Sequence, residues 1–176
     1  MPRVYPNSKV ITQVRSSLNG PTLVTLTRLL AVPGLFWLLS LPGDEVRVWA
    51  AGLFLVAAAT DWLDGYLARR LNQVTELGKF LDPLVDKLLV LAPLLILVGF
   101  NEVPAWGVFL ILLRELAIAG WRVQQPTVTG ANWAGKLKTV VQVVAVTALL
   151  LKLPFALALF WAAVILTLWS GWNYLK

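Results

Sequence analysis

Six apolar stretches of roughly 20 residues, the length that crosses a lipid bilayer as a helix, follow one another along this chain. They cover about residues 22–41, 46–70, 77–100, 104–124, 134–152 and 154–175. Because 59% of the 176 residues are hydrophobic and only 14% are charged, too few residues lie outside these stretches to form a separate soluble domain. The sequence therefore predicts an all-α integral membrane protein with six transmembrane helices.

The first 20 residues differ from the rest of the chain. They carry Arg3, Lys9 and Arg15 among apolar residues at roughly helical spacing, and they contain no continuous apolar core. This pattern suits a short amphipathic helix on the membrane surface and does not suit a signal peptide. We therefore divide the chain into an N-terminal juxtamembrane segment, 1–20, and one membrane domain, 21–176.

Positive charge is distributed unevenly between the two ends of the predicted helices. The short connections around 42–44, 101–102 and 152–154 fall on one side, and only Arg47 and Lys152 of the 15 Lys and Arg residues belong to that side. By the positive-inside rule, the other side is cytoplasmic, and both termini lie there. This topology, together with attraction to anionic lipid, accounts for the net charge of +6 without a nucleic-acid partner.

Four aspartates lie in the second and third apolar stretches. They belong to the motif Asp61-x2-Asp64-Gly65-x2-Ala68-Arg69-x8-Gly78-x3-Asp82-x3-Asp86. An ionisable group inside a membrane segment costs at least ~2.5 kcal/mol, so four carboxylates need a compensating partner. The spacings place the motif residues on one face of each helix, and an antiparallel hairpin would bring the two faces together. The small residues Gly65, Ala68 and Gly78 would let the backbones approach closely.

A metal site is the obvious way to compensate these carboxylates. The chain has no cysteine and no histidine, so carboxylate oxygens are its only anionic metal ligands. Oxygen-only sites favour hard cations such as Mg²⁺, Mn²⁺ or Ca²⁺. Taken alone, however, intramembrane acids fit a structural polar network, cation or proton transport, and catalysis.

The complete motif resembles the signature of the CDP-alcohol phosphotransferases. Further segments resemble the branch of that family that joins CDP-diacylglycerol to sn-glycerol 3-phosphate and releases CMP. These segments are 19–28, 114–115 with Arg122, 135–139 with Gln142, and 166–170 with Tyr174. The resemblance implies a multi-pass enzyme of the bacterial cytoplasmic (inner) membrane, with a cytoplasm-facing active site and a homodimeric assembly. Sister enzymes that use inositol phosphate or serine are the alternative within the family, and a cation or proton transporter is the alternative outside it.

The resemblance also implies roles for individual residues. Two ions, Mg²⁺ or Mn²⁺, would be held by Asp61, Asp64, Asp82 and Asp86. Asp86 would also be the general base that deprotonates the acceptor hydroxyl. The CDP pocket would comprise Asp61, Gly65, Ala68, Arg69 and Gly78. The phosphate of the acceptor would be bound by Arg114, Arg122, Lys136 and Lys138. Because the chain lacks a Cys or His nucleophile, we expect direct displacement without a covalent intermediate.

Judged by position alone, the residues expected to bind the acceptor phosphate could instead have a purely structural role. Arg114 and Glu115 could form an internal salt bridge on their helix, although the depth of Arg114 favours a buried role. Lys136 and Lys138 lie where any cytoplasmic loop would carry cations.

Overall fold

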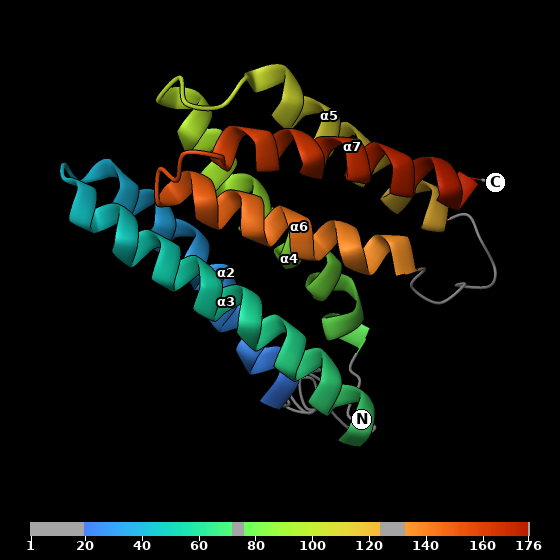
Figure 1. The fold of residues 1–176 in the computed structure, drawn as a ribbon. Coiled ribbons are helices and arrows are strands. Elements are labelled where there is room, and N and C mark those ends of the chain that lie inside the picture. Colours follow the sequence, from blue (N-terminus) through green and yellow to red (C-terminus); the bar gives the residue numbers. More distant parts are fainter. Residues whose placement is uncertain (1–19, 72–75, 124–132, 176) are drawn as a thin grey trace, which may run out of the picture.

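The structure, a computed structural model, describes residues 20–71, 76–123 and 133–175. Side chains are described for residues 28–60, 84–121, 133 and 135–173. The regular structure of the described residues consists of six helices (Figure 1). These are α2 (Gly20–Ser40), α3 (Asp44–Leu71), α4 (Glu76–Gly99), α5 (Ala105–Val123), α6 (Trp133–Leu150) and α7 (Ala156–Leu175). The predicted all-α architecture with six main helices is confirmed for this part of the chain, whereas the proposed N-terminal helix in 1–20 lies almost entirely outside it.

The helix boundaries differ from the predicted apolar stretches by at most two residues. At the start of α3, Asp44 and Glu45 extend the helix beyond the apolar stretch, because acidic side chains in a first turn interact favourably with the helix dipole. Helix α6 ends two residues early because the chain turns at Lys152, which has a φ of 52°.

The ends of α4 and α6 share one hydrogen-bonding pattern. After α6, the Leu153 amide donates to the Ala148 carbonyl at 2.9 Å and the Lys152 amide donates to the Leu149 carbonyl at 3.1 Å. After α4, the equivalent bonds are made around Asn101, whose φ is 58°. Both ends are therefore Schellman motifs, which satisfy the last helical carbonyls through one residue in the left-handed conformation. Each motif produces a tight reversal into the next helix.

The three short connections lie at the same end of the molecule, as predicted (Figure 1). Arg47 at the start of α3 makes two hydrogen bonds, of 2.8 and 2.5 Å, to Glu102 in the α4–α5 loop. Lys152 in the α6–α7 turn donates to Asp44 at 2.8 Å, and this hydrogen bond holds the pKa of Asp44 below its usual value. These two ion pairs tie both later connections to the start of α3.

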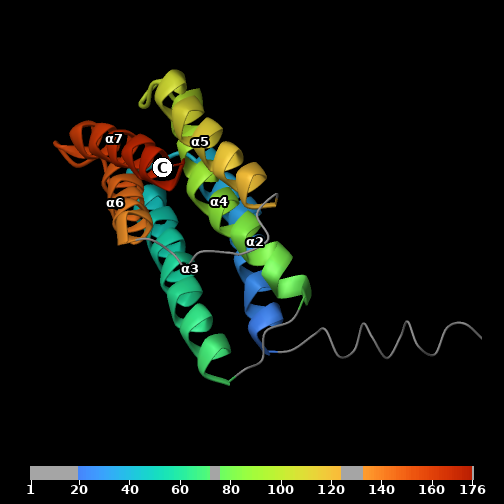
Figure 2. The same cartoon turned by 90° about the vertical axis from the view of Figure 1, so that its right-hand side faces the viewer.

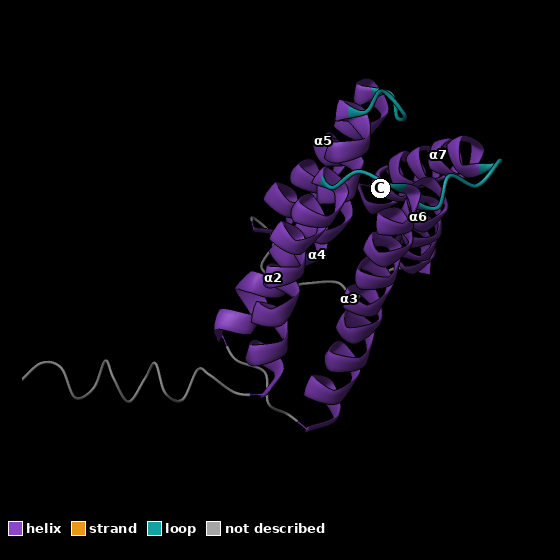
Figure 3. Ribbon diagram, turned by 90° about the vertical axis from the view of Figure 1, so that its left-hand side faces the viewer, coloured by secondary structure: helices purple, strands orange, loops and turns teal. Residues whose placement is uncertain are grey.

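Helix α2 packs extensively against both α3 and α4, which contact each other less than each contacts α2. Helix α7 packs against α6 and α5 (Figures 2 and 3). The largest fully buried side chains include Leu35, Phe54, Leu97 and Phe160, one each from α2, α3, α4 and α7. The apolar core therefore links the first three helices to the last three.

The outer surface of the helices is strongly apolar. Among the residues with described side chains, one stretch, Ala156–Asn173 of α7, is long and apolar enough to cross a bilayer, and 39% of it is buried inside the protein. Large apolar side chains elsewhere, including Leu30, Trp49 and Phe155, are exposed. Extended apolar exposure of this kind marks a surface that contacts lipid or another protein.

Candidate functional site

The aspartate motif lies on two regular helices. Helix α3 continues without interruption through Asp61 and Asp64, and α4 continues through Asp82 and Asp86, so the predicted helical spacing is present in the backbone. Most motif side chains lie outside the described part of the chain, namely those of Asp61, Asp64, Gly65, Ala68, Arg69, Gly78 and Asp82. Their convergence into one carboxylate cluster stays a prediction.

Asp86 is the motif aspartate whose side chain the structure describes. Its carboxylate accepts a hydrogen bond of 3.1 Å from Arg28 Nη1 on α2. The Arg28 side chain is only 4% exposed, whereas that of Asp86 is 46% exposed. The buried arginine therefore anchors a carboxylate that is still accessible.

Arg28 belongs to the first predicted apolar stretch and to the 19–28 segment that resembles the family, but no role was predicted for it. A signal was present, because Arg28 is the only charged residue between Arg15 and Asp44. A charge isolated within an apolar helix needs a partner, and such residues commonly mark functional sites. The partner of Arg28, Asp86, lies on another helix and was not predicted from the sequence.

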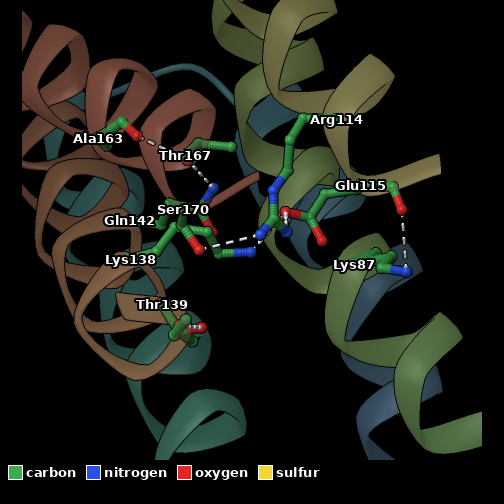
Figure 4. A network of polar contacts seen from close by, with 10 residues as sticks. Lys87, Arg114, Glu115, Lys138, Thr139, Gln142, Ala163, Thr167 and Ser170 are labelled. Atoms are coloured by element: carbon green, nitrogen blue, oxygen red, sulfur yellow. Dashed lines mark hydrogen bonds and ion pairs between the residues drawn. The ribbon is translucent and has the colours of Figure 1, made fainter. Parts of the chain in front are cut away.

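A second polar cluster is centred on Glu115 (Figure 4). The Glu115 carboxylate accepts hydrogen bonds from Arg114 at 3.0 Å and from Lys138 at 2.5 Å, and the Glu115 backbone carbonyl lies 3.5 Å from Lys87 Nζ. Glu115 and Lys138 are both buried. Arg114 also donates to Ser170 Oγ at 3.0 Å, so α4, α5, α6 and α7 all contribute to this cluster.

The cluster carries more positive than negative charge. Among the residues whose side chains are described, Lys87, Arg114 and Lys138 supply three cations and Glu115 supplies one carboxylate, which leaves a surplus of two positive charges. Paired in this way, the buried cations avoid the full cost of desolvation. The surplus makes the cluster suited to an anionic ligand.

Two neighbouring hydrogen bonds share Thr167 of α7, and one of them joins α6 to α7. Gln142 donates to Thr167 Oγ1 at 2.9 Å, and Thr167 donates to the Ala163 carbonyl at 2.6 Å (Figure 4). Gln142 and Thr167 are both buried. The bond from Gln142 to Thr167 joins the two helices that present Lys138 and Ser170 to the cluster.

The structure brings together two of the four residues predicted to bind the acceptor phosphate. Arg114 and Lys138 meet at the Glu115 carboxylate, so the salt bridge considered for Arg114 and Glu115 is present and includes Lys138 as well. Lys136 is exposed on α6, and the side chain of Arg122 lies outside the described residues.

Comparison with known proteins identifies the family. The sequence model of the CDP-alcohol phosphatidyltransferases matches residues 18–169. The chain belongs to the CDP-alcohol phosphatidyltransferase family. It is 45% identical over 179 residues to the CDP-diacylglycerol–glycerol-3-phosphate 3-phosphatidyltransferase of Bacillus subtilis (strain 168), an alignment that covers 89% of this chain and 93% of that protein. It is also 39% identical to the protein of the same name from Escherichia coli (strain K12) and 38% identical to that from Salmonella choleraesuis, with 90% of this chain and 93% of each relative covered.

Membership of the CDP-alcohol phosphatidyltransferase family confirms the resemblance inferred from the aspartate motif. It makes the chain a transferase of a membrane-bound, generally metal-dependent family. Among the residues with described side chains, no three acidic, histidine or cysteine side chains gather in one place. The fit to a metal is therefore judged on Asp86. Its carboxylate is accessible, and carboxylate oxygens suit hard divalent cations.

A cavity of about 370 Å³ lies away from these clusters, at the end of the molecule where the three short connections meet. Its lining includes Gly43, Asp44, Arg47, Phe100 and Lys152. Arg47 and Lys152 are already paired with carboxylates there. The family's aspartate motif is on the distant half of α3, so this cavity is not the candidate active site.

Proposed function

We propose that this protein transfers the phosphatidyl group of CDP-diacylglycerol to sn-glycerol 3-phosphate, giving phosphatidylglycerophosphate and CMP. The observation that carries this proposal is the 45% identity to the B. subtilis transferase, whose name states both substrates and which the alignment covers over 93% of its length. The acceptor hydroxyl oxygen forms a bond to the phosphatidyl phosphorus, the anhydride bond to the CMP phosphate breaks, and the hydroxyl proton passes to a base. The reaction needs no covalent enzyme intermediate, in keeping with a chain that has no cysteine or histidine.

The four motif aspartates, Asp61, Asp64, Asp82 and Asp86, would hold two divalent cations, Mg²⁺ or Mn²⁺. When bound, such ions neutralise the charge of the pyrophosphate and favour in-line displacement. The cytidine diphosphate would be bound by Asp61, Gly65, Ala68, Arg69 and Gly78. Arg69 would pair with the pyrophosphate through two parallel hydrogen bonds.

Asp86 is the residue to which we assign the acceptor proton. Its carboxylate is accessible, and Arg28 holds it from the buried side at 3.1 Å. A base must lie within hydrogen-bonding reach of the proton that it removes, so a fixed orientation favours transfer. Arg28 thus supports the base without occupying the exposed side of the carboxylate.

The acceptor phosphate would be bound by Arg114, Arg122, Lys136 and Lys138. The surplus of two positive charges around Glu115 supports this assignment, because it matches the charge of a phosphate dianion. Serine, a zwitterion, and glycerol, a neutral molecule, would leave that surplus uncompensated. Charge-assisted hydrogen bonds at the far end of the acceptor would also orient its hydroxyl toward the phosphatidyl phosphorus.

We further propose that α2 to α7 all cross the bacterial cytoplasmic membrane, with both termini and the active site on the cytoplasmic side. The 1–20 segment would lie on the membrane surface, and the enzyme would act as a homodimer. Support comes from the meeting of the three short connections at one end, where Arg47 and Lys152 are each paired with a carboxylate. The other 13 of the 15 Lys and Arg residues belong to the opposite end by sequence, as the positive-inside rule requires of the cytoplasmic side.

A panel of acceptors tests the proposed reaction. Purified protein in detergent would receive CDP-diacylglycerol and Mg²⁺ together with sn-glycerol 3-phosphate, glycerol, serine or inositol phosphate, and CMP release would be followed. We expect rapid release with sn-glycerol 3-phosphate and very slow release with the other three acceptors. Equal or faster release with serine or inositol phosphate would instead assign the chain to a sister enzyme of the family. Cation flux in proteoliposomes without CMP release would favour a transporter.

A further inference from the structure

Two different helices hold the Arg114 guanidinium. Its Nη1 donates to Glu115 on α5 at 3.0 Å, and its Nη2 donates to Ser170 on α7 at 3.0 Å (Figure 4). The Arg114 side chain is 12% exposed, and Ser170 is buried. Because the guanidinium is planar, fixing one hydrogen bond on each Nη atom also fixes the direction of the second N–H on each of them.

The next residue of α7, Gly171, determines where the stem of Arg114 can lie. A Cβ atom added at Gly171 would lie 3.0 Å from Arg114 Cγ, 3.1 Å from Nε and 3.6 Å from Cδ. The distances to Cγ and Nε are tighter than ordinary contacts of a Cβ atom, so the stem rests directly on the glycine backbone. Any larger residue at this position would push the stem away.

This packing leaves one buried hydrogen-bond donor of Arg114, its Nε, without a partner among the described residues. A buried donor without a partner is unfavourable, and such exceptions call for an explanation in terms of strain or function. Here the gain is a single conformation of the guanidinium, with both Nη atoms anchored.

We propose that Ser170 and Gly171 are positioning residues for the phosphorylated acceptor: the hydroxyl and the bare backbone of α7 select the one Arg114 conformation that presents its remaining N–H groups to the acceptor phosphate. The inference rests on the proposed function, because it takes Arg114 as a contact of that phosphate. Two parallel N–H groups recognise phosphate only when the plane of the guanidinium is correctly oriented. Acceptor recognition then depends on two residues of α7 that lie 84 and 85 positions beyond Asp86, the last residue of the aspartate motif.

The first test is Gly171→Ala. A displacement of Arg114 by a few tenths of an ångström should raise the KM for sn-glycerol 3-phosphate roughly tenfold, since misplacement of a contact by about 1 Å can cost a hundredfold. The KM for CDP-diacylglycerol should change far less. Gly52→Ala is the matched control, because Gly52 is also helical and an added Cβ there meets nothing within 4 Å. Ser170→Ala removes one hydrogen bond to the same guanidinium and should raise the KM for the acceptor roughly twofold to tenfold.

A double-mutant cycle separates positioning from simple packing. Adding Gly171→Ala to an Arg114→Ala variant should leave the KM for the acceptor within about twofold of the Arg114→Ala value, because residues that act through one another are not additive. The same holds for Ser170→Ala, which provides a second cycle should Gly171→Ala fold poorly. Full, additive effects of both substitutions in the Arg114→Ala background would overturn the inference.

The same cycle distinguishes failure of the inference from failure of the proposed function. If Arg114→Ala alone leaves the KM for sn-glycerol 3-phosphate unchanged, the assignment of Arg114 to the acceptor site is wrong, and the inference falls with it. If Arg114→Ala raises that KM while Gly171→Ala and Ser170→Ala act independently of it, only the inference fails. Equal increases in the KM values for both substrates would likewise indicate packing alone.

Discussion

Arg28 and Glu115 are charged side chains within apolar helices, and both find counter-ions on other helices. Arg28 of α2 pairs with Asp86 of α4, and Glu115 of α5 pairs with Lys138 of α6 as well as with its neighbour Arg114. A buried charge without a partner is strongly destabilising, so each pair constrains two helices at once. The residues that we assign to chemistry and to acceptor binding thus also determine how helices meet.

Replacing Asp86 by Asn tests its assignment as the base. The amide keeps the shape of the side chain and can still accept a hydrogen bond from Arg28, but it cannot take up the acceptor proton. We expect turnover to fall by roughly a hundredfold or more, while binding of CDP-diacylglycerol, measured by calorimetry, is largely kept. Asp61→Asn should instead weaken binding of metal and nucleotide together. Loss of nucleotide binding in Asp86→Asn, with normal binding in Asp61→Asn, would reverse these assignments.

Removing the charge of Glu115 tests its place at the centre of the cation cluster. Glu115→Gln leaves Lys138 buried without an anionic partner, which should cost about 3 kcal/mol of stability. The unfolding transition in detergent, followed by tryptophan fluorescence, measures the loss. Combining Glu115→Gln with Lys138→Met should recover most of it, because the second substitution removes the stranded cation. A double variant no more stable than Glu115→Gln would show that the pairing with Lys138 contributes little.

At the scale of the helices, close packing between α5 and α7 supports the presentation of Arg114. Gly107 of α5 faces the ring of Phe160 on α7, and the tilted rings of Trp106 and Trp161 pack together with centroids 4.3 Å apart. Phe160 is fully buried. This contact and the bond between Arg114 and Ser170 join the same two helices, so movement of either helix would disturb both.

Gly107→Ala tests that packing. An added Cβ would lie 2.7 and 2.8 Å from two atoms of the Phe160 ring, which has no space to move into because it is buried. We expect a loss of about 1 to 3 kcal/mol in stability, the usual cost of overpacking. Gly120→Ala on the same helix is the control, since an added Cβ there meets nothing within 4 Å. Equal unfolding midpoints for the two variants would contradict the close contact.

The helices and their boundaries were predictable from the sequence, whereas the choice of which helices pack against one another was not. Apolar length and turn-forming residues such as Pro42 and Gly43 determine where a helix ends, which is why the boundaries agree within two residues. Which helices pack together depends on complementary shapes that the apolar pattern does not encode, so the central position of α2 was not foreseen. For the same reason the sequence indicated Arg114 and Lys138 as site residues but not their shared carboxylate, Ser170 or Gly171.

At the scale of the whole molecule, the ends of the helices differ in charge. The end with the short connections has its cations matched by Asp44 and Glu102, while the other end carries the excess that we assign to the cytoplasmic side. Substrates with several negative charges, such as CDP-diacylglycerol and sn-glycerol 3-phosphate, would be attracted to that excess. Topology and substrate recognition would then depend on the same distribution of charge.

Single cysteines test the topology directly, because the chain contains none. Glu45→Cys places an exposed thiol at the end with the short connections, and Thr127→Cys places one in the connection between α5 and α6. In spheroplasts, a membrane-impermeant maleimide should label the first variant and should label the second only after permeabilisation. Labelling in the opposite order would invert the proposed orientation, and labelling of both in intact spheroplasts would contradict the six membrane crossings.

The central claim, metal-dependent transfer from CDP-diacylglycerol to sn-glycerol 3-phosphate, is tested most directly by the stoichiometry of one reaction. Radiolabelled sn-glycerol 3-phosphate would be incubated with the purified protein, CDP-diacylglycerol and Mg²⁺, and label in extracted lipid would be compared with CMP released. We expect equal amounts of labelled lipid and CMP, with both products abolished by excess chelator and restored by added Mg²⁺. CMP release without label in lipid, or full turnover in the presence of excess chelator, would contradict the proposed reaction.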